Sequence, residues 1–184
     1  PGEEHPDKDP LFAKQLADLG DVYVDDAFGT AHRAHASTAS ITQYFPAASA
    51  AGFLLEKEIE VLGGALAKPK RPFCAILGGA KISTKFGVIS SLMAKADTVL
   101  IGGGMAFTFM KAKGLPIGKS LCEEDAVDQA RKLLDASGKG GAKLLLPADI
   151  VITKDLKEGA PSMIVDAHSG IPDGYQGVDI GPKT

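Results

Sequence analysis

The sequence contains no tryptophan, no asparagine and only two cysteines among its 184 residues. Without asparagine, this stretch of chain offers no N-glycosylation site. Cys74 and Cys122 each stand in an apolar stretch, so we expect free, buried thiols and a reducing, cytoplasmic compartment. Aromatic residues amount to 6% and the net charge is -3, which argues against a stacking or basic surface for nucleic acid. We therefore expect no nucleic-acid partner.

Long apolar runs are missing as well. The uncharged run from Thr98 to Met110 has 13 residues, three of them glycines, whereas a membrane span needs roughly 20 apolar residues. Residues Pro1 to Glu4 are polar and acidic, unlike the start of a signal peptide. We therefore expect no membrane contact. The proportions of 45% hydrophobic and 23% charged residues are typical of a globular protein.

Segments typical of strands alternate with segments typical of helices. Strands are predicted at 21–28, 73–77, 98–101, 143–146, 150–153 and 162–166, and helices at 10–19, 51–67, 81–95, 105–113 and 123–137. The strands are short and little interrupted by polar residues, which is typical of strands buried on both faces. The pattern predicts an α/β fold with a doubly wound, Rossmann-like parallel sheet.

The segment from Lys68 to Pro72 divides this pattern into two parts. Residues 1–50 are predicted to hold one helix, one strand and a long segment rich in Ala, Ser and Thr, which is too little to bury a core. We therefore expect the chain to be an interior portion of a longer polypeptide. Residues 1–50 would be the tail of a preceding domain whose other strands are absent.

Glycine is abundant, with 22 of 184 residues, or about 12%, against a usual value near 7%. Gly78 and Gly79 lie between the predicted strand at 73–77 and the predicted helix that begins at Lys81. Open α/β sheets bind ligands outside the carboxyl ends of their strands, where helix N-termini present unpaired N–H groups. Glycines at such a point let a ligand approach the backbone.

Lys81 and Lys85 are predicted to lie on one face at the start of that helix. A cation in the first turn opposes the helix dipole at a cost of about 0.3–1 kcal/mol. Like charges at i and i+4 repel each other by roughly 0.2–0.5 kcal/mol. A bound polyanion, such as a phosphate chain, would offset both costs. The alternative is a solvated helix face with two ordinary lysines.

A second glycine run, Gly102–Gly104, follows the next predicted strand. It has no basic neighbour, so it suits either the approach of a flat apolar group such as adenine or tight packing of strand and helix. Residues 114–120 look like a P-loop, but they follow a helix, contain proline and have one residue too few between the glycines. No G-x-G-x-x-G run follows a strand, which disfavours a dinucleotide-dependent dehydrogenase.

Carboxylates, imidazoles and an arginine gather at residues 25–35, after the first predicted strand. Asp25, Asp26, His32 and His35 have a spacing compatible with a metal site, but Arg33 among them would repel a cation. An arginine on a loop is better suited to bind a carboxylate or a phosphate in a bidentate manner. We therefore expect Arg33 to bind an anion.

These stretches together resemble the phosphoglycerate kinases. They are Asp26–Arg33, Leu77–Lys81 with Lys85, Ile101–Phe109, Gly170–Gly174 and Gly177–Pro182, in the order and spacing of that family along nearly the whole chain. The resemblance implies two doubly wound domains that face each other. One would bind 3-phosphoglycerate or 1,3-bisphosphoglycerate, and residues 1–50 would be its end. The other would bind Mg-ADP or Mg-ATP and include residues 69–184, with 51–68 as the interdomain helix.

The resemblance also implies roles for single residues. Arg33 resembles an arginine that holds the phosphoglycerate, Lys81 the lysine that accompanies the transferred phosphoryl group, and Lys85 the lysine that holds the nucleotide phosphates. The nucleotide site would further include Gly79, Ala80, Gly103, Gly104, Leu121 and Gly177. Thr84 stands where some members have an aspartate, so any role of that aspartate in placing magnesium would have to be met elsewhere.

The implied activity is reversible phosphoryl transfer from 1,3-bisphosphoglycerate to ADP, giving 3-phosphoglycerate and ATP. The enzyme would be a cytoplasmic monomer with Mg2+ bound to the nucleotide. Both halves of that active site would be incomplete in this chain, so we expect that the chain alone does not turn over. The alternative is a noncatalytic nucleotide-binding module that keeps Gly79, Lys81 and Lys85.

Overall fold

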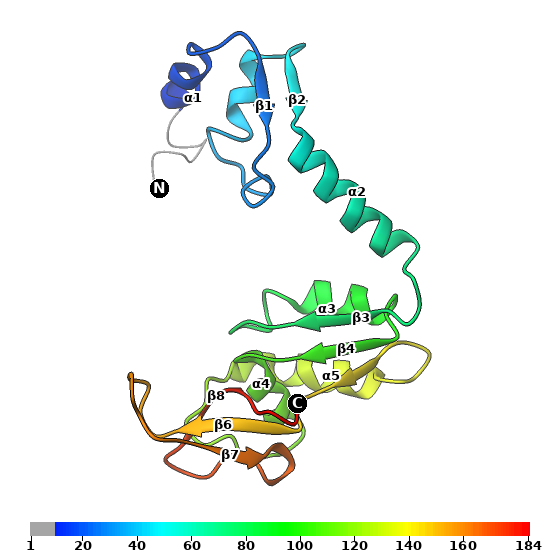
Figure 1. Cartoon of the computed structure of the whole chain (residues 1–184), viewed down its shortest axis with the longest axis vertical. Helices are drawn as coiled ribbons and strands as arrows, with labels where there is room; N and C mark the ends of the chain where they lie inside the picture. The colour runs from blue at the N-terminus through cyan, green and yellow to red at the C-terminus, as the bar shows by residue number, and fades with distance from the viewer. Residues whose placement is uncertain (1–9) are drawn as a thin grey trace. The chain divides into compact units, whose positions relative to one another are not determined.

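The structure is a computed structural model that describes residues 10–184 (Figure 1). The chain divides after Lys68 into two compact units, the second of which runs from Pro69 to Thr184. Every helix among residues 10–184 is too short or too polar to span a bilayer. The polar segment from Pro1 to Glu4 lies outside the described residues.

The first unit is built on a two-stranded parallel sheet. Its elements are α1 (Pro10–Ala17), β1 (Tyr23–Asp25), the 3-10 helix η1 (Ser40–Tyr44), β2 (Ser49–Ala51) and α2 (Phe53–Ala67), with β1 paired to β2. Ala17, Ile41 and Phe45 form a small core, and the ring of Tyr23 stacks on that of Phe45 with centroids 6.3 Å apart. The elements η1 and β2 lie in the Ala-, Ser- and Thr-rich segment, where the sequence pattern predicted none.

The second unit begins with the alternation that the sequence predicts. Strands β3 (Cys74–Leu77), β4 (Thr98–Ile101) and β5 (Lys143–Leu145) form a parallel sheet in that order, with helices α3 (Phe86–Met93), α4 (Met105–Ala112) and α5 (Val127–Ala136) between them and the short 3-10 helix η2 (Glu124–Ala126) before α5. The prediction of an α/β fold with parallel strands is confirmed.

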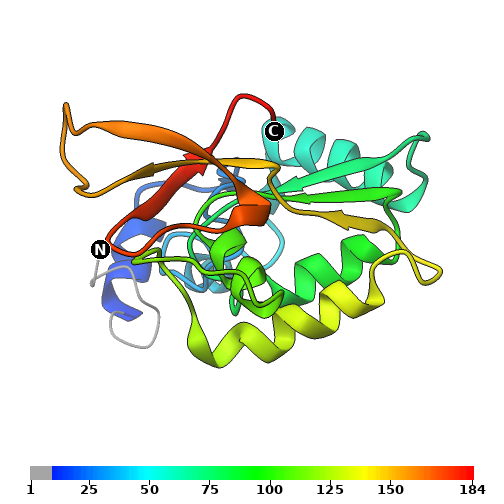
Figure 2. The same ribbon diagram turned by 90° about the horizontal axis from the view of Figure 1, so that it is seen from below.

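Only one face of this sheet is covered in the described chain. Ala75, Val99 and Leu144 lie opposite one another across the three strands and are buried in a core with α3, α4 and α5. Figure 2 shows α3 and α5 along this face. On the other face Ile76 is 78% exposed and Leu145 is 48% exposed. The prediction that these strands are buried on both faces is therefore wrong for this chain.

The two cysteines are free, but they are not both buried as expected. Cys74 is exposed and Cys122 is half-buried. Side chains alternate along a strand, so Cys74 shares the uncovered sheet face with Ile76. Burial raises the pKa of the Cys122 thiol, which keeps it protonated at neutral pH.

The remaining strands form a second sheet that is antiparallel, whereas the sequence pattern placed 150–153 and 162–166 in the parallel sheet. β6 (Asp149–Thr153) lies between β7 (Ser162–Asp166) and β8 (Gln176–Ile180), with the short 3-10 helix η3 (Ala167–Ser169) after β7 (Figure 1). Residues 154–161 join β6 to β7 without a helix, whereas a parallel pair needs a crossover of a dozen or more residues. β8 was not predicted, because glycine and polar residues interrupt its apolar pattern.

Helix α4 packs against both sheets. Ala106 and Phe109 belong to the core beneath β3, β4 and β5. Phe107 and Met110, on the same helix, belong to a second core with Ile152 of β6. Because α4 contributes to both cores, it fixes the two sheets relative to each other and to the loops at its own N-terminus.

Asp149, at the start of β6, holds the segment that follows β8. Its side chain is 2% exposed and accepts hydrogen bonds from the backbone N–H groups of Lys183 (3.0 Å) and Thr184 (2.9 Å) and from the Thr184 hydroxyl (2.7 Å). Burial by itself raises the pKa of Asp149, but the hydrogen bonds from Thr184 and Lys183 outweigh it and lower the pKa below its usual value.

We predict that Asp149→Asn destabilises the second unit at neutral pH. The difference in free energy of unfolding between this variant and the unmodified chain is expected to become smaller in acid. A carboxylate whose pKa falls on folding contributes stability above its unfolded pKa of about 3.9, and this contribution is lost as the pH falls through the folded pKa. Urea unfolding between pH 7 and about pH 3 measures the difference. Asp155→Asn is the control, because the Asp155 carboxylate is exposed and its ion pair with the amine of Lys157 is long, at 3.6 Å. Equal effects of both variants, or an effect independent of pH, would contradict the role of Asp149.

Candidate functional site

Two glycine turns meet at the carboxyl ends of β3 and β4. The turn after β3 contains Gly78 and Gly79, and the turn after β4 contains Gly102–Gly104 and leads directly into α4. The backbone carbonyl of Gly79 accepts a hydrogen bond from the backbone N–H of Met105, the first residue of α4, at 2.8 Å. The first turn is thereby bonded to the helix that the second turn begins.

The close approach leaves no room for a side chain at Gly103. Its φ is +64°, in the left-handed region, and a Cβ would lie 2.8 Å from the nitrogen and 3.1 Å from the oxygen of Gly79. A Cβ on Gly104 would lie 3.2 Å from Cδ2 of Leu121 and 3.4 Å from Cα of Ala80. Five residues that the family resemblance assigns to the nucleotide site therefore lie side by side. We call this set, Gly79, Ala80, Gly103, Gly104 and Leu121, the glycine corner.

The glycine corner is open to solvent. Gly79 and Ala80 are exposed, and the side chain of Leu121 is 54% exposed. A flat apolar group can therefore reach both backbone and apolar surface here. Tight packing alone accounts for the glycine at Gly103, but it does not require the corner to be uncovered.

Gly177 is joined to the glycine corner through a neighbouring residue. A Cβ on Gly177 would collide with the ring of Phe107 on α4. Its backbone N–H donates to the hydroxyl of Ser120 at 2.8 Å, and Ser120 directly precedes Leu121. The hydroxyl of Ser120 thus links β8 to the corner, a role that the sequence pattern did not reveal.

Lys81 and Lys85 do not lie in the first turn of a helix, as the sequence predicted. Residues 82–85 form turns, and α3 begins only after Lys85. The hydroxyl of Thr84 donates to the carbonyl of Lys81 at 3.2 Å, and the backbone N–H of Ser83 donates to the carboxylate of Glu123. Such bonds compete with helix formation and delay its start. The argument from the helix dipole and from charges one turn apart is therefore wrong.

Both lysines are nevertheless placed where an anion could reach them. Lys81 and Lys85 are exposed, and they follow the corner residue Ala80 in the same loop. Within residues 10–184, neither amine has a carboxylate within ion-pair distance. Their positive charges are available to a ligand of the corner.

Arg33 belongs to the first unit, whereas the glycine corner belongs to the second. Arg33 is exposed, and its carbonyl accepts a hydrogen bond from the hydroxyl of Thr38 at 2.6 Å. Asp26 has a structural task, because its carboxylate accepts the backbone N–H of Leu55 at 2.9 Å at the start of α2. The part of the chain that the structure describes contains no group of three or more metal-ligating side chains, so the metal alternative gains no support.

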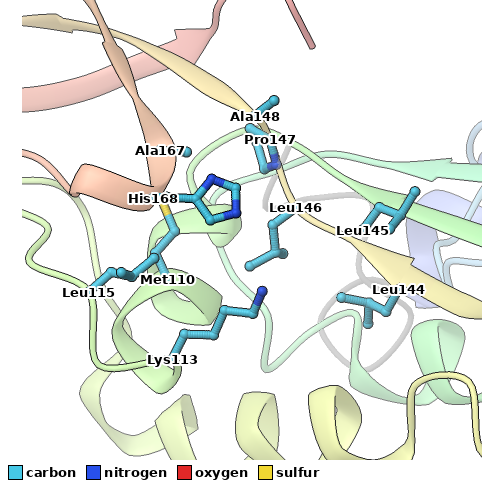
Figure 3. A pocket seen from close by; sticks show the side chains of 10 residues that line it. All are labelled: Met110, Lys113, Leu115, Leu144, Leu145, Leu146, Pro147, Ala148, Ala167 and His168. Carbon is cyan, nitrogen blue, oxygen red and sulfur yellow. The ribbon is translucent and has the colours of Figure 1, made fainter.

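A cavity of about 400 Å³ lies elsewhere in the second unit (Figure 3). Its walls come from Met110, Leu115 and residues 144–148, and Lys113 and His168 supply its polar side chains. The cavity shares no residue with the glycine corner. It also lacks a nucleophile beside the imidazole, so its lining suggests no reaction.

The model of the phosphoglycerate kinase family matches residues 1–184. The chain belongs to this family. The phosphoglycerate kinase of Moorella thermoacetica is 56% identical over 183 residues, which are 98% of this chain and 46% of the relative. The cytosolic phosphoglycerate kinase of Triticum aestivum is 53% identical over 182 residues, 99% of this chain and 45% of the relative. The structure of phosphoglycerate kinase from Coxiella burnetii matches with a TM-score of 0.76 and 38% identity, over 98% of this chain and 46% of that one.

The comparisons confirm the family resemblance that the sequence motifs carry. They also show that this chain spans less than half the length of these relatives, so it is a partial phosphoglycerate kinase. The roles of single residues and the assignment of 1–50, 51–68 and 69–184 to named domains stay predictions.

We predict that Gly103→Ala destabilises the second unit by about 1–3 kcal/mol, because the methyl group meets the Gly79 backbone in a strained conformation. Gly78→Ala is the matched control, since a Cβ there meets nothing within 4 Å. We expect the control to change the free energy of unfolding by no more than about 0.5 kcal/mol. Urea unfolding of both variants measures the difference. Equal losses would show that the two turns do not approach as described.

Proposed function

We propose that this chain supplies the nucleotide-binding part, and a piece of the phosphoglycerate-binding part, of a phosphoglycerate kinase. The reaction is the reversible transfer of a phosphoryl group from 1,3-bisphosphoglycerate to ADP, giving 3-phosphoglycerate and ATP. The glycine corner is the observation that carries the proposal. An open corner at the carboxyl ends of parallel strands, at a helix N-terminus, is the place where α/β proteins bind nucleotides.

In this proposal each part of the corner meets a different part of the nucleotide. The exposed backbone at Gly79 and the side chain of Leu121 lie against the adenine. Lys85 binds the nucleotide phosphates, and Lys81 neutralises charge on the phosphoryl group as it moves. Arg33, in the first unit, binds the phosphoglycerate.

The proposed chemistry needs no covalent intermediate with the protein. The bond between phosphorus and the carboxyl oxygen of the acyl phosphate breaks, and a bond forms to an oxygen of the ADP β-phosphate. Positioning of the two substrates and stabilisation of charge supply the catalysis. Mg2+ bound to the nucleotide would supply further positive charge. The described residues offer no cluster of ligands for it, so we assign it no protein ligand.

The setting of the enzyme follows from the same resemblance. We propose a monomer in the cytoplasm, in keeping with the cytosolic wheat relative. Because the chain covers 45–46% of the relatives' length, we expect that it binds nucleotide but does not turn over by itself.

Calorimetric titration of the 184-residue chain with Mg-ADP tests the proposal. We predict saturable binding that Lys85→Ala weakens by about ten- to a hundredfold, because a charge-assisted hydrogen bond contributes about 1.5–3 kcal/mol. Lys95→Ala is the control, since it removes the same charge from an exposed lysine just after α3. The absence of binding, or equal weakening by both variants, would contradict the proposal.

A coupled assay of ATP formation from 1,3-bisphosphoglycerate separates the enzyme from the noncatalytic module. We expect ATP formation by a longer polypeptide that contains this sequence and none by the 184-residue chain. Mg-ADP binding without ATP formation in the longer polypeptide would favour the module.

A further inference from the structure

The turn that carries Lys81 and Lys85 is held by a carboxylate that lies 40 positions away in the sequence. Oε1 of Glu123 accepts the hydroxyl of Ser83 at 2.6 Å, and Oε2 accepts the backbone N–H of Ser83 at 3.0 Å. Two bonds from one carboxylate to one residue fix the orientation of the turn as well as its distance.

Glu123 is itself fixed to α4. Its backbone N–H donates to the hydroxyl of Thr108 at 3.2 Å, and Thr108 is fully buried. The next residue, Glu124, accepts a bond from the amine of Lys111 at 2.6 Å, one turn further along the helix. The segment that bears Glu123 is therefore anchored on a helix that packs in both cores of the unit.

The charge of Glu123 strengthens this link. The hydroxyl and then the backbone N–H of Ser83 lower the pKa of Glu123, and the charge of Lys81 adds a smaller effect in the same direction. The carboxylate is therefore ionised at neutral pH, and hydrogen bonds to an ionised acceptor are about twice as strong as neutral ones.

Ile82 also anchors the turn. The side chain of Ile82 is fully buried in the core beneath β3, β4 and β5. An apolar side chain holds the turn against the core, but it makes no directional bond that would fix the orientation of the turn. The two bonds at Ser83, next to Ile82, supply that direction for the exposed side of the turn.

We propose that Glu123 is a positioning residue for the nucleotide site: through Ser83 it fixes the turn that presents Lys81 and Lys85 to the phosphates. The proposal rests on the function proposed above for the two lysines. Glu123 touches no reacting atom in this account, because its oxygens are occupied by Ser83.

The test compares Glu123→Ala with Asp125→Ala in the 184-residue chain, by Mg-ADP titration and by hydrogen exchange of the amides at 81–85. Both variants lose one carboxylate from the same segment, but Asp125 is exposed and only Glu123→Ala frees the turn. We expect Glu123→Ala to weaken Mg-ADP binding about five- to tenfold and to speed exchange in the turn. We expect Asp125→Ala to change neither quantity.

Further variants separate positioning from loss of folding. Glu123→Gln keeps one acceptor oxygen and is expected to restore part of the affinity. Ser83→Ala combined with Glu123→Ala is expected to bind no more weakly than Glu123→Ala alone, because both remove the same link. Urea unfolding of each variant shows whether the unit remains folded.

Each outcome decides the matter. Weaker binding together with faster exchange, in Glu123→Ala alone, supports the proposal. Unchanged affinity with faster exchange overturns it, since the link would then be structural only, and unchanged exchange overturns the link itself. If the unmodified chain binds no Mg-ADP, the proposed function fails and the positioning role fails with it, whereas exchange still reports whether Glu123 holds the turn.

Discussion

The backbones of Gly79 and Gly103 approach so closely that position 103 has no room for a Cβ. This contact brings together the carboxyl ends of two parallel strands and lets the Gly79 carbonyl bond the first residue of α4. Because α4 packs in both cores, its buried contacts fix the position of the glycine corner at its N-terminus. A surface site is thus fixed by the interior, although Gly79, Ala80 and Leu121 are exposed.

The short segment at 120–124 contacts the other parts of the site and holds them in place. Ser120 bonds β8 at Gly177, Leu121 lies against Gly104, and Glu123 bonds the turn of the two lysines. The site is therefore assembled from the turns after β3 and β4 and from strand β8, all of which contact the segment at 120–124. Such an arrangement suits the phosphoryl transfer that we propose, in which the protein contributes mainly position and charge.

The sequence predicted the parallel strands well, because each is a short apolar run that ends at glycine or at a break. It also predicted which residues would gather at the corner, through the family motifs. It failed for the start of α3, since one of the two bonds that delay that helix comes from Glu123, far away in the chain. It failed for the burial of β3, because a uniformly apolar run such as Cys74–Leu77 does not show which face is covered. The antiparallel second sheet could have been predicted from the connection at 154–161, which is too short and has no helix. Such a connection is stronger evidence for the strand direction than the composition of the strands.

We propose that the glycine corner, and not the cavity of about 400 Å³, binds the nucleotide. Nuclear magnetic resonance of the 15N-labelled chain during titration with Mg-ADP distinguishes these two places. We expect saturable shifts of the backbone amides of Gly79, Gly103 and Gly177, with the amides of Leu145 and His168 unchanged. Shifts centred on Leu145 and His168, or no shifts at the three glycines, would contradict it.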